Sequence, residues 1–84
     1  MNFLTIFRSI KMAITGKVIQ RIDTPIMDRQ CTISLRLKRD SQGRKYVVLA
    51  GMASGNYQYY PMKLEEFKQL TDAAIAIQSA AAAE

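Results

Sequence analysis

The residues best suited to a chemical role form a short basic segment, residues 36–45, with the sequence RLKRDSQGRK. This segment holds five of the twelve lysines and arginines in the chain and a single acid, Asp40. Guanidinium and ammonium groups bind phosphate oxygens through charge-assisted hydrogen bonds. The segment therefore predicts a surface for an anionic partner, and nucleic acid is the partner that we expect first.

Three of the four tyrosines form a second cluster, Tyr57, Tyr59 and Tyr60. Tyrosine is a good strand residue, so one interpretation is that these rings only cover a hydrophobic core. However, strand side chains alternate between two faces, and three tyrosines within four residues place aromatic rings on both. Unpaired bases stack on such rings and gain about 1–3 kcal/mol each. We therefore expect at least one tyrosine beside the basic residues.

The rest of the composition argues against catalysis. The chain has no histidine, one cysteine (Cys31) and seven acids scattered along 84 residues. One thiol without histidine cannot assemble a zinc site or an intrachain disulfide. We expect no enzymatic activity, no metal and no cofactor. The formal net charge of +5 and the pI near 9.7 instead favour an anionic partner.

Two predicted strands, residues 31–38 and 45–50, position the basic segment, and a turn with Gly43 joins them. Alternation gives the first strand an apolar face and a polar face. The apolar face takes Cys31, Ile33, Leu35 and Leu37, and the polar face takes Thr32, Ser34, Arg36 and Lys38.

The register of this hairpin is predicted with Lys38 opposite Lys45, which places Arg36, Lys38 and Lys45 on the polar face. Tyr46 and the valine two residues later then join the apolar face. Two directly opposed lysines repel each other. An anion bound between them would relieve that repulsion, which gives mild support to a binding role.

The remaining elements complete an α+β fold of four antiparallel strands and a long C-terminal helix, in the order β-β-β-β-α. Asp23, Thr24 and Pro25 are typical of a turn after the first strand, Gly16 suggests a bend within it, and Pro61 is expected to end the sheet. The predicted ranges are residues 13–22 for the first strand, 51–55 for the second turn, 56–60 for the fourth strand and about 63–83 for the helix.

The predicted helix carries apolar residues at steps of three and four, which is typical of a helix–helix seam. It is longer than a sheet of this size needs, and 84 residues in one small domain are marginally stable alone. We therefore expect a homodimer. The residues expected in the dimer interface are Leu70, Ala74, Ile77 and Ala81.

Residues 1–12 precede the domain (residues 13–84) and read as an amphipathic helix without acids, in which Phe3, Ile6, Phe7 and Ile10 share one side. Three interpretations stay open. The segment docks on the domain or its dimer partner, which we favour; residues 1–11 contact a membrane surface or direct the chain to an organelle; or the chain starts at Met12.

The order of elements, with a basic and partly aromatic sheet face, resembles the single-stranded-nucleic-acid-binding group of the Pur-alpha repeat, the positive cofactor family and the plant Whirly proteins. The local similarity is to the Pur repeat, in residues 35–50 (LRLKRDSQGRKYVVLA) and 60–70 (YPMKLEEFKQL). An aromatic residue in the second strand and a glutamate closing the third are typical of that repeat, whereas Ile33, Leu35 and Ala50-Gly51 stand here. The resemblance implies an intertwined dimer whose strands grip single-stranded DNA or RNA.

We therefore expect an intracellular protein that binds single-stranded DNA or RNA without catalysis and with little sequence specificity. The alternative hypothesis is a small protein-interaction module, an inhibitor or assembly factor that binds an acidic protein through the same residues. The predicted binding residues are Lys17, Arg21, Arg36, Lys38, Arg44, Lys45, Tyr57, Tyr59 and Tyr60.

Overall fold

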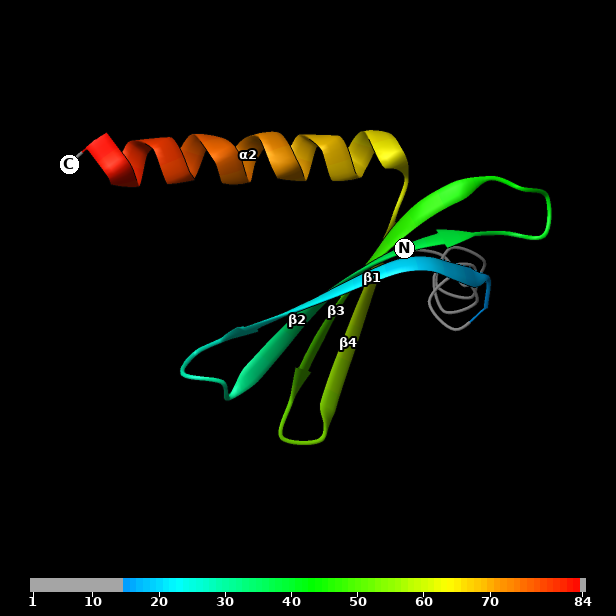
Figure 1. Ribbon diagram of the computed structural model, residues 1–84, viewed down its shortest axis with the longest axis horizontal. Helices are drawn as coiled ribbons and strands as arrows, with labels where there is room; N and C mark the ends of the chain where they lie inside the picture. Colours follow the sequence, from blue (N-terminus) through cyan, green and yellow to red (C-terminus); the bar gives the residue numbers. More distant parts are fainter. Residues whose placement is uncertain (1–14, 84) are drawn as a thin grey trace, which may run out of the picture.

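The computed structural model describes residues 15–83, so the amphipathic segment expected over residues 1–12 lies outside the described residues. Figure 1 shows a four-stranded sheet followed by one helix, which confirms the predicted α+β fold. Neighbouring strands are antiparallel and follow the order of the chain. The elements are β1 (Lys17–Ile26), β2 (Cys31–Arg39), β3 (Lys45–Ala53), β4 (Asn56–Met62) and α2 (Leu64–Ala83).

Both prolines lie inside strands. The sequence predicted a turn at Pro25 and the end of the sheet at Pro61. Pro25 pairs with Thr32 in β1, and Pro61 pairs with Val48 in β4. Both strands form edges of the sheet. An edge strand tolerates proline because the missing N–H can fall on its unpaired side. The predicted turn at residues 23–25 is therefore wrong, and the connection to β2 begins at Met27.

The irregularity of β1 lies at a different residue from the one predicted. The register shifts between Val18 and Gln20, so Ile19 is the extra residue of a β-bulge, while Gly16 precedes the strand. The bulge places Val18 and Ile22 on opposite faces, opposite Lys38 and Leu35. This explains why the apolar residues of the segment alternate imperfectly in the sequence.

All three turns between the strands contain residues with positive φ. Between β1 and β2, Met27, Asp28 and Arg29 all have positive φ (55°, 53° and 70°), a conformation that costs L-residues about 1–2 kcal/mol each. Between β3 and β4, Ser54 and Gly55 form the whole turn with φ of 46° and 82°, as two-residue hairpins prefer. The predicted turn over residues 51–55 is thus too long, because β3 continues to Ala53.

The β2–β3 register differs by one residue from the prediction. Arg39, not Lys38, lies opposite Lys45, and Lys38 lies opposite Tyr46. The cause is the turn, because the Asp40 amide donates to the Arg44 carbonyl oxygen (2.9 Å) and closes the hairpin one residue later in β2. A one-residue slip moves every side chain of a strand to the other face.

The sheet therefore has two faces that differ from the predicted ones in β3. We call the first the Arg–Tyr face; its members are Arg21, Asp23, Ser34, Arg36, Lys38, Tyr46, Val48, Ala50, Met52, Tyr57 and Tyr59. We call the second the apolar face; its members are Ile22, Ile33, Leu35, Leu37, Val47, Leu49 and Tyr60, with Arg39 and Lys45 at one end.

The most buried side chains are concentrated on the Arg–Tyr face, although that face carries the charges. Ser34, Val48 and Ala50 are fully buried there, and of the apolar face only Val47 is buried to a similar degree. Ser34 lies beside Arg36, whose Nε donates a hydrogen bond to the Ser34 hydroxyl. The sheet thus does not follow the simple division into a buried apolar face and an exposed polar face that the sequence predicted.

Helix α2 covers only part of the apolar face. None of its 20 residues is buried, and Phe67 and Thr71 are the half-buried ones among them. Figure 1 shows the helix running away from the sheet after its first turns. Within the part of the chain that the structure describes, no helix is long and apolar enough to cross a membrane.

Candidate nucleic-acid interface

The centre of the Arg–Tyr face brings two arginines together with two tyrosines. Arg21 on β1 lies directly opposite Arg36 on β2, and Tyr57 and Tyr59 come from β4 at the far edge. Strand β1 flanks β2, and this pairing places Arg21 beside Arg36. Because β1 and β4 are both edge strands, these four residues span the whole width of the sheet.

Arg36 is held in a defined position at the middle of this face. Its Nε donates a hydrogen bond to Ser34 Oγ (3.1 Å), which explains why Ser34 is buried beneath it. Its guanidinium lies 5.8 Å from the centre of the Tyr59 ring, within the range of a cation–π interaction. A planar guanidinium fixed in this way is well suited to bidentate contact with phosphate.

Asp23 partly neutralises the opposed arginines. Arg21 Nε donates to Asp23 Oδ1 at 2.9 Å. This bond, with further contributions from Ser34 and from the charge of Arg36, holds the pKa of the Asp23 carboxyl below its usual range. The two arginines thus share one permanently ionised carboxylate at neutral pH, and the site keeps a net positive charge.

The two tyrosines of this face are accessible to a ligand. Tyr57 is 59% exposed and Tyr59 is 39% exposed. Tyr60, the third tyrosine of the cluster, belongs to the apolar face opposite Leu49. The prediction that the cluster places aromatic rings on both faces, with at least one beside the basic residues, is therefore confirmed. A surface with exposed rings and fixed guanidinium groups can stack bases and bind phosphates.

Lys38 lies on the same face but is hardly accessible. Its side chain is 4% exposed, opposite Tyr46, with Nζ 6.0 Å from the centre of the Tyr46 ring. Burial, with a smaller contribution from the charge of Arg36, lowers the pKa of Lys38. The Tyr46 hydroxyl donates to the Thr15 carbonyl oxygen at 3.0 Å, which fixes the ring. Lys38 is therefore placed to support the face rather than to contact a ligand.

Other predicted binding residues lie elsewhere. Lys17 and Lys45 lie on the side of the apolar face, opposite Arg39, and so not beside Arg36. Arg44 lies in the β2–β3 turn, where its Nε donates to Asp40 Oδ2 at 3.2 Å. The grouping of Arg36 with Lys45 was wrong because the register slipped by one residue.

Two residues that the sequence did not single out take part in these charged groups. Asp23 was assigned to a turn, and its contact with Arg21 became visible only once β1 extended past it. Arg39 lies one residue beyond the predicted end of its strand. The signal for it was present, because Arg39 continues the alternation of Leu35 and Leu37.

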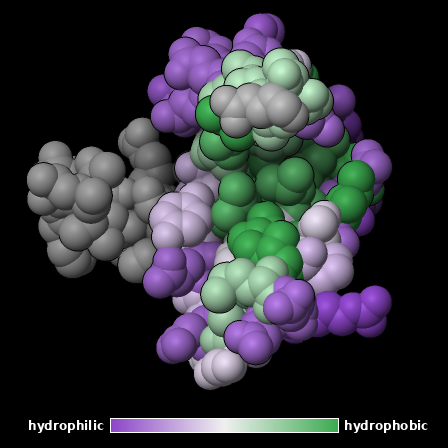
Figure 2. Space-filling model, turned by 90° about the vertical axis from the view of Figure 1, so that its left-hand side faces the viewer, coloured by the Kyte–Doolittle hydropathy of each residue, from purple (hydrophilic) through white to green (hydrophobic). Residues whose placement is uncertain are grey.

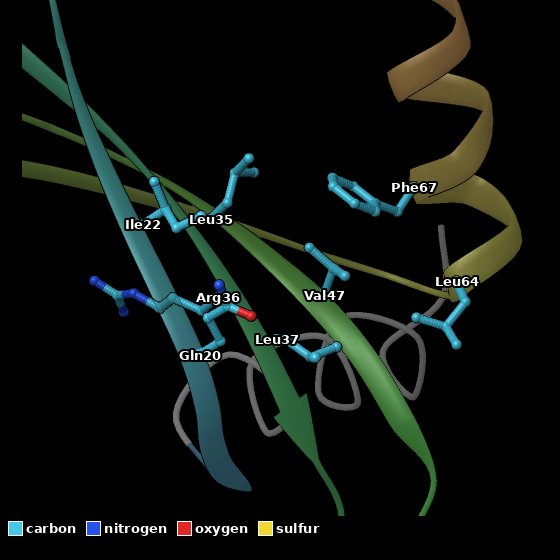
Figure 3. A pocket seen from close by; sticks show the side chains of 8 residues that line it. All are labelled: Gln20, Ile22, Leu35, Arg36, Leu37, Val47, Leu64 and Phe67. Carbon is cyan, nitrogen blue, oxygen red and sulfur yellow. The ribbon is translucent and has the colours of Figure 1, made fainter.

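The apolar face has a hollow between the sheet and α2. Figure 2, which looks along α2 from its C-terminal end, shows hydrophobic surface between the helix at the top and the sheet below. The hollow has a volume of about 300 Å³ and is lined in part by Leu35, Val47 and Phe67. Figure 3 shows Phe67 pointing toward the strands, whereas the Arg36 guanidinium points away from the hollow. The lining offers no charged side-chain group that would select a polar ligand.

Within residues 15–83, no three acid, cysteine or histidine side chains are grouped closely enough to hold a metal ion. Comparison of the chain with protein-family models, with curated proteins and with solved structures found no match.

Proposed function

We propose that this protein binds single-stranded DNA or RNA, without catalysis, on the Arg–Tyr face. The observation that carries the proposal is the Arg36 guanidinium, which lies 5.8 Å from the exposed Tyr59 ring and directly opposite Arg21. Exposed aromatic rings beside fixed cations suit a flexible strand whose bases are unpaired. The resemblance to the Pur repeat agrees with this proposal and stays a prediction.

In the proposed complex, phosphates bind Arg21 and Arg36, and bases stack on Tyr57 and Tyr59. Released counterions supply much of the binding free energy, so affinity falls as salt is added. Stacking accepts every base, and Arg36 reads charge rather than base edges. Little sequence specificity and a preference for single strands over duplex are therefore expected.

The first test is fluorescence anisotropy with a labelled single-stranded 20-mer and the double variant Tyr57→Leu/Tyr59→Leu. Each lost stacking contact is expected to cost about 1–3 kcal/mol, or roughly 5- to 150-fold in Kd. Tyr60→Leu is the matched control, because Tyr60 belongs to the same strand but to the apolar face. It should leave the affinity nearly unchanged.

Equal losses from both tyrosine variants, or no loss from either, would contradict the proposed face. Binding that stays weak even at low salt would instead favour the second class of function, recognition of an acidic protein by the same arginines and tyrosines. Duplex DNA as a competitor completes the test, because equal competition would mean that the basic surface accepts any polyanion.

We further propose that two copies associate through α2. The helix is about 30 Å long and contributes no buried side chain to its own chain. Leu70 is 43% exposed and Ile77 is 70% exposed, and both lie on the predicted dimer seam with Ala74 and Ala81. Exposed aliphatic residues at heptad spacing are typical of a helix that packs against another helix.

A further inference from the structure

Three basic residues form a row across one end of the sheet. Lys17 on β1 lies directly opposite Arg39 on β2, and Arg39 lies directly opposite Lys45 on β3. All three side chains are exposed and lie on the side of the apolar face. We call these three residues the cationic row. Adjacent strands are about 4.8 Å apart, so the row spans roughly 10 Å.

The cationic row is unfavourable by itself, because like charges directly opposite each other on neighbouring strands destabilise a sheet. The other like-charged pair of this sheet, Arg21 and Arg36, has Asp23 beside it at 2.9 Å from Arg21. Among the residues that the structure describes, none forms an ion pair with the row. The same sheet thus neutralises one cationic pair and leaves the other without an acid.

Two acids close to the row in the sequence or at the start of the helix, Asp40 and Glu66, already have partners. Asp40 Oδ1 accepts hydrogen bonds from the Gln42 and Arg44 amides, both at 2.9 Å, and Asp40 Oδ2 pairs with Arg44. At the start of α2, Glu66 accepts from the Lys63 amide at 2.9 Å. The residues before Lys17 contain no acid at all. Since no described acid pairs with the row, an anion from outside the chain would relieve its repulsion.

We propose that the cationic row binds consecutive phosphates of the nucleic-acid strand whose bases stack on the Arg–Tyr face. The nature of the strand rests on the proposed function, whereas the phosphate site rests on the row itself. Arg39 follows Arg36 by three residues on β2, about 10 Å along the strand. Residues three apart on a strand point to opposite faces, so a nucleic-acid strand bound at Arg36 reaches the row by passing around this end of the sheet, from the Arg–Tyr face to the side of the apolar face.

The test compares the double variant Arg39→Gln/Lys45→Gln with Arg29→Gln/Lys68→Gln, which loses the same charge in the β1–β2 turn and on α2. Binding of a single-stranded 20-mer is followed by anisotropy at several salt concentrations. Two lost phosphate contacts should reduce the slope of log K against log salt by about 1.4. The control should keep the wild-type slope, and an unchanged slope in the row variant would overturn the proposed strand contact.

Thermal unfolding gives an independent readout with inorganic polyphosphate as the probe. Without the probe at low salt, the row variant should have a Tm equal to or above that of the wild type, because mutual repulsion is removed. Polyphosphate should raise the Tm of the wild type and of the control more than that of the row variant. A lower Tm of the row variant, with equal protection by polyphosphate, would show a structural role and overturn the site.

The two proposals fail in different ways. Loss of affinity in the tyrosine variant with an unchanged slope in the row variant would reject the row alone. Selective protection by polyphosphate without any binding of the 20-mer would reject single-strand binding and keep the phosphate site.

Discussion

At the scale of single residues, Asp23 sets how much positive charge the Arg–Tyr face presents. Its carboxylate accepts from Arg21 and lies within the field of Arg36, so it competes with an incoming phosphate for both. Such a carboxylate lowers affinity while it prevents repulsion between the arginines in the free protein. Asp23 therefore stabilises the free protein but weakens the attraction of the site for an anion.

Asp23→Asn is expected to tighten binding of the single-stranded 20-mer severalfold and to steepen its salt dependence. The physical reason is that Arg21 becomes free to bind a phosphate. Anisotropy titrations at two salt concentrations measure both effects. Asp28→Asn, in the β1–β2 turn, changes the net charge equally and is the control. An equal gain in both variants would mean that only net charge matters.

Asp40 holds the β2–β3 turn through hydrogen bonds to two backbone amides. The lowered pKa of its carboxyl makes the stability of the fold depend on pH. The Arg44 amide, together with that of Gln42 and the Arg44 side chain, holds the pKa of Asp40 below its usual value. A carboxyl with a lowered folded-state pKa stabilises the fold above its unfolded pKa of about 3.9, and this stabilisation is lost as the pH falls through the folded value.

We therefore expect Asp40→Ala to lower the Tm by a few degrees at pH 7 and by less at acidic pH, where the wild type has lost the same contribution. Thermal unfolding followed by circular dichroism between pH 7 and pH 3 measures the difference. A gap between the two proteins that stays constant with pH would contradict this role of the carboxylate.

At the scale of elements, the start of β1 is fixed by a close approach to β3. Gly16 has a φ of 85°, and a Cβ there would overlap the Tyr46 hydroxyl and lie 3.2 Å from the Arg39 carbonyl oxygen. The Tyr46 hydroxyl holds the same segment through its bond to Thr15. Glycine is thus required at this position for two reasons, backbone conformation and space.

Gly16→Ala should lower the free energy of unfolding by about 2–4 kcal/mol. The positive φ costs an alanine about 1–2 kcal/mol, and the added Cβ must also displace the Tyr46 ring. Gly55→Ala is the matched control, since Gly55 has a φ of 82° and nothing within 4 Å of the added Cβ. It should cost about 1–2 kcal/mol. Chemical denaturation of both variants separates the two causes, and equal losses would argue against the contact with Tyr46.

At the scale of the whole molecule, two hydrophobic surfaces are left uncovered by residues 15–83. One is the apolar side of β1, where Ile22 and Ile26 are exposed, and the other is the helix itself. A small chain gains stability when such surfaces are buried between copies. Dimerisation through α2 would also bring two Arg–Tyr faces into one particle and raise the avidity for a long strand.

The dimer predicts that size-exclusion chromatography with light scattering gives twice the 9.5 kDa of one chain. Leu70→Glu/Ile77→Glu should shift the mass to that of a monomer, because it places charges on the seam. Gln69→Glu/Ala76→Glu introduces the same charges at the same spacing on another side of the helix and should leave the mass unchanged. A wild-type protein with the mass of one chain would contradict the dimer.

Local periodicity in the sequence determined the kinds of elements and much of the site. Alternation along β2 was sufficient to separate Arg36 from Leu35, and steps of three and four were sufficient to predict α2. The spacing of Tyr57 and Tyr59 likewise placed them on one face. These features depend on geometry within one element, which neighbouring residues specify.

Only the tertiary structure determined which side chains of neighbouring strands lie next to each other. The β2–β3 register depends on how Asp40 closes its turn, and one residue of slip moved Lys45 away from Arg36 and next to Arg39. The pairing of β1 kept Pro25 in a strand, which brought Asp23 to Arg21. Register, pairing and burial arise from contacts between segments far apart in the chain, so no local pattern contains them.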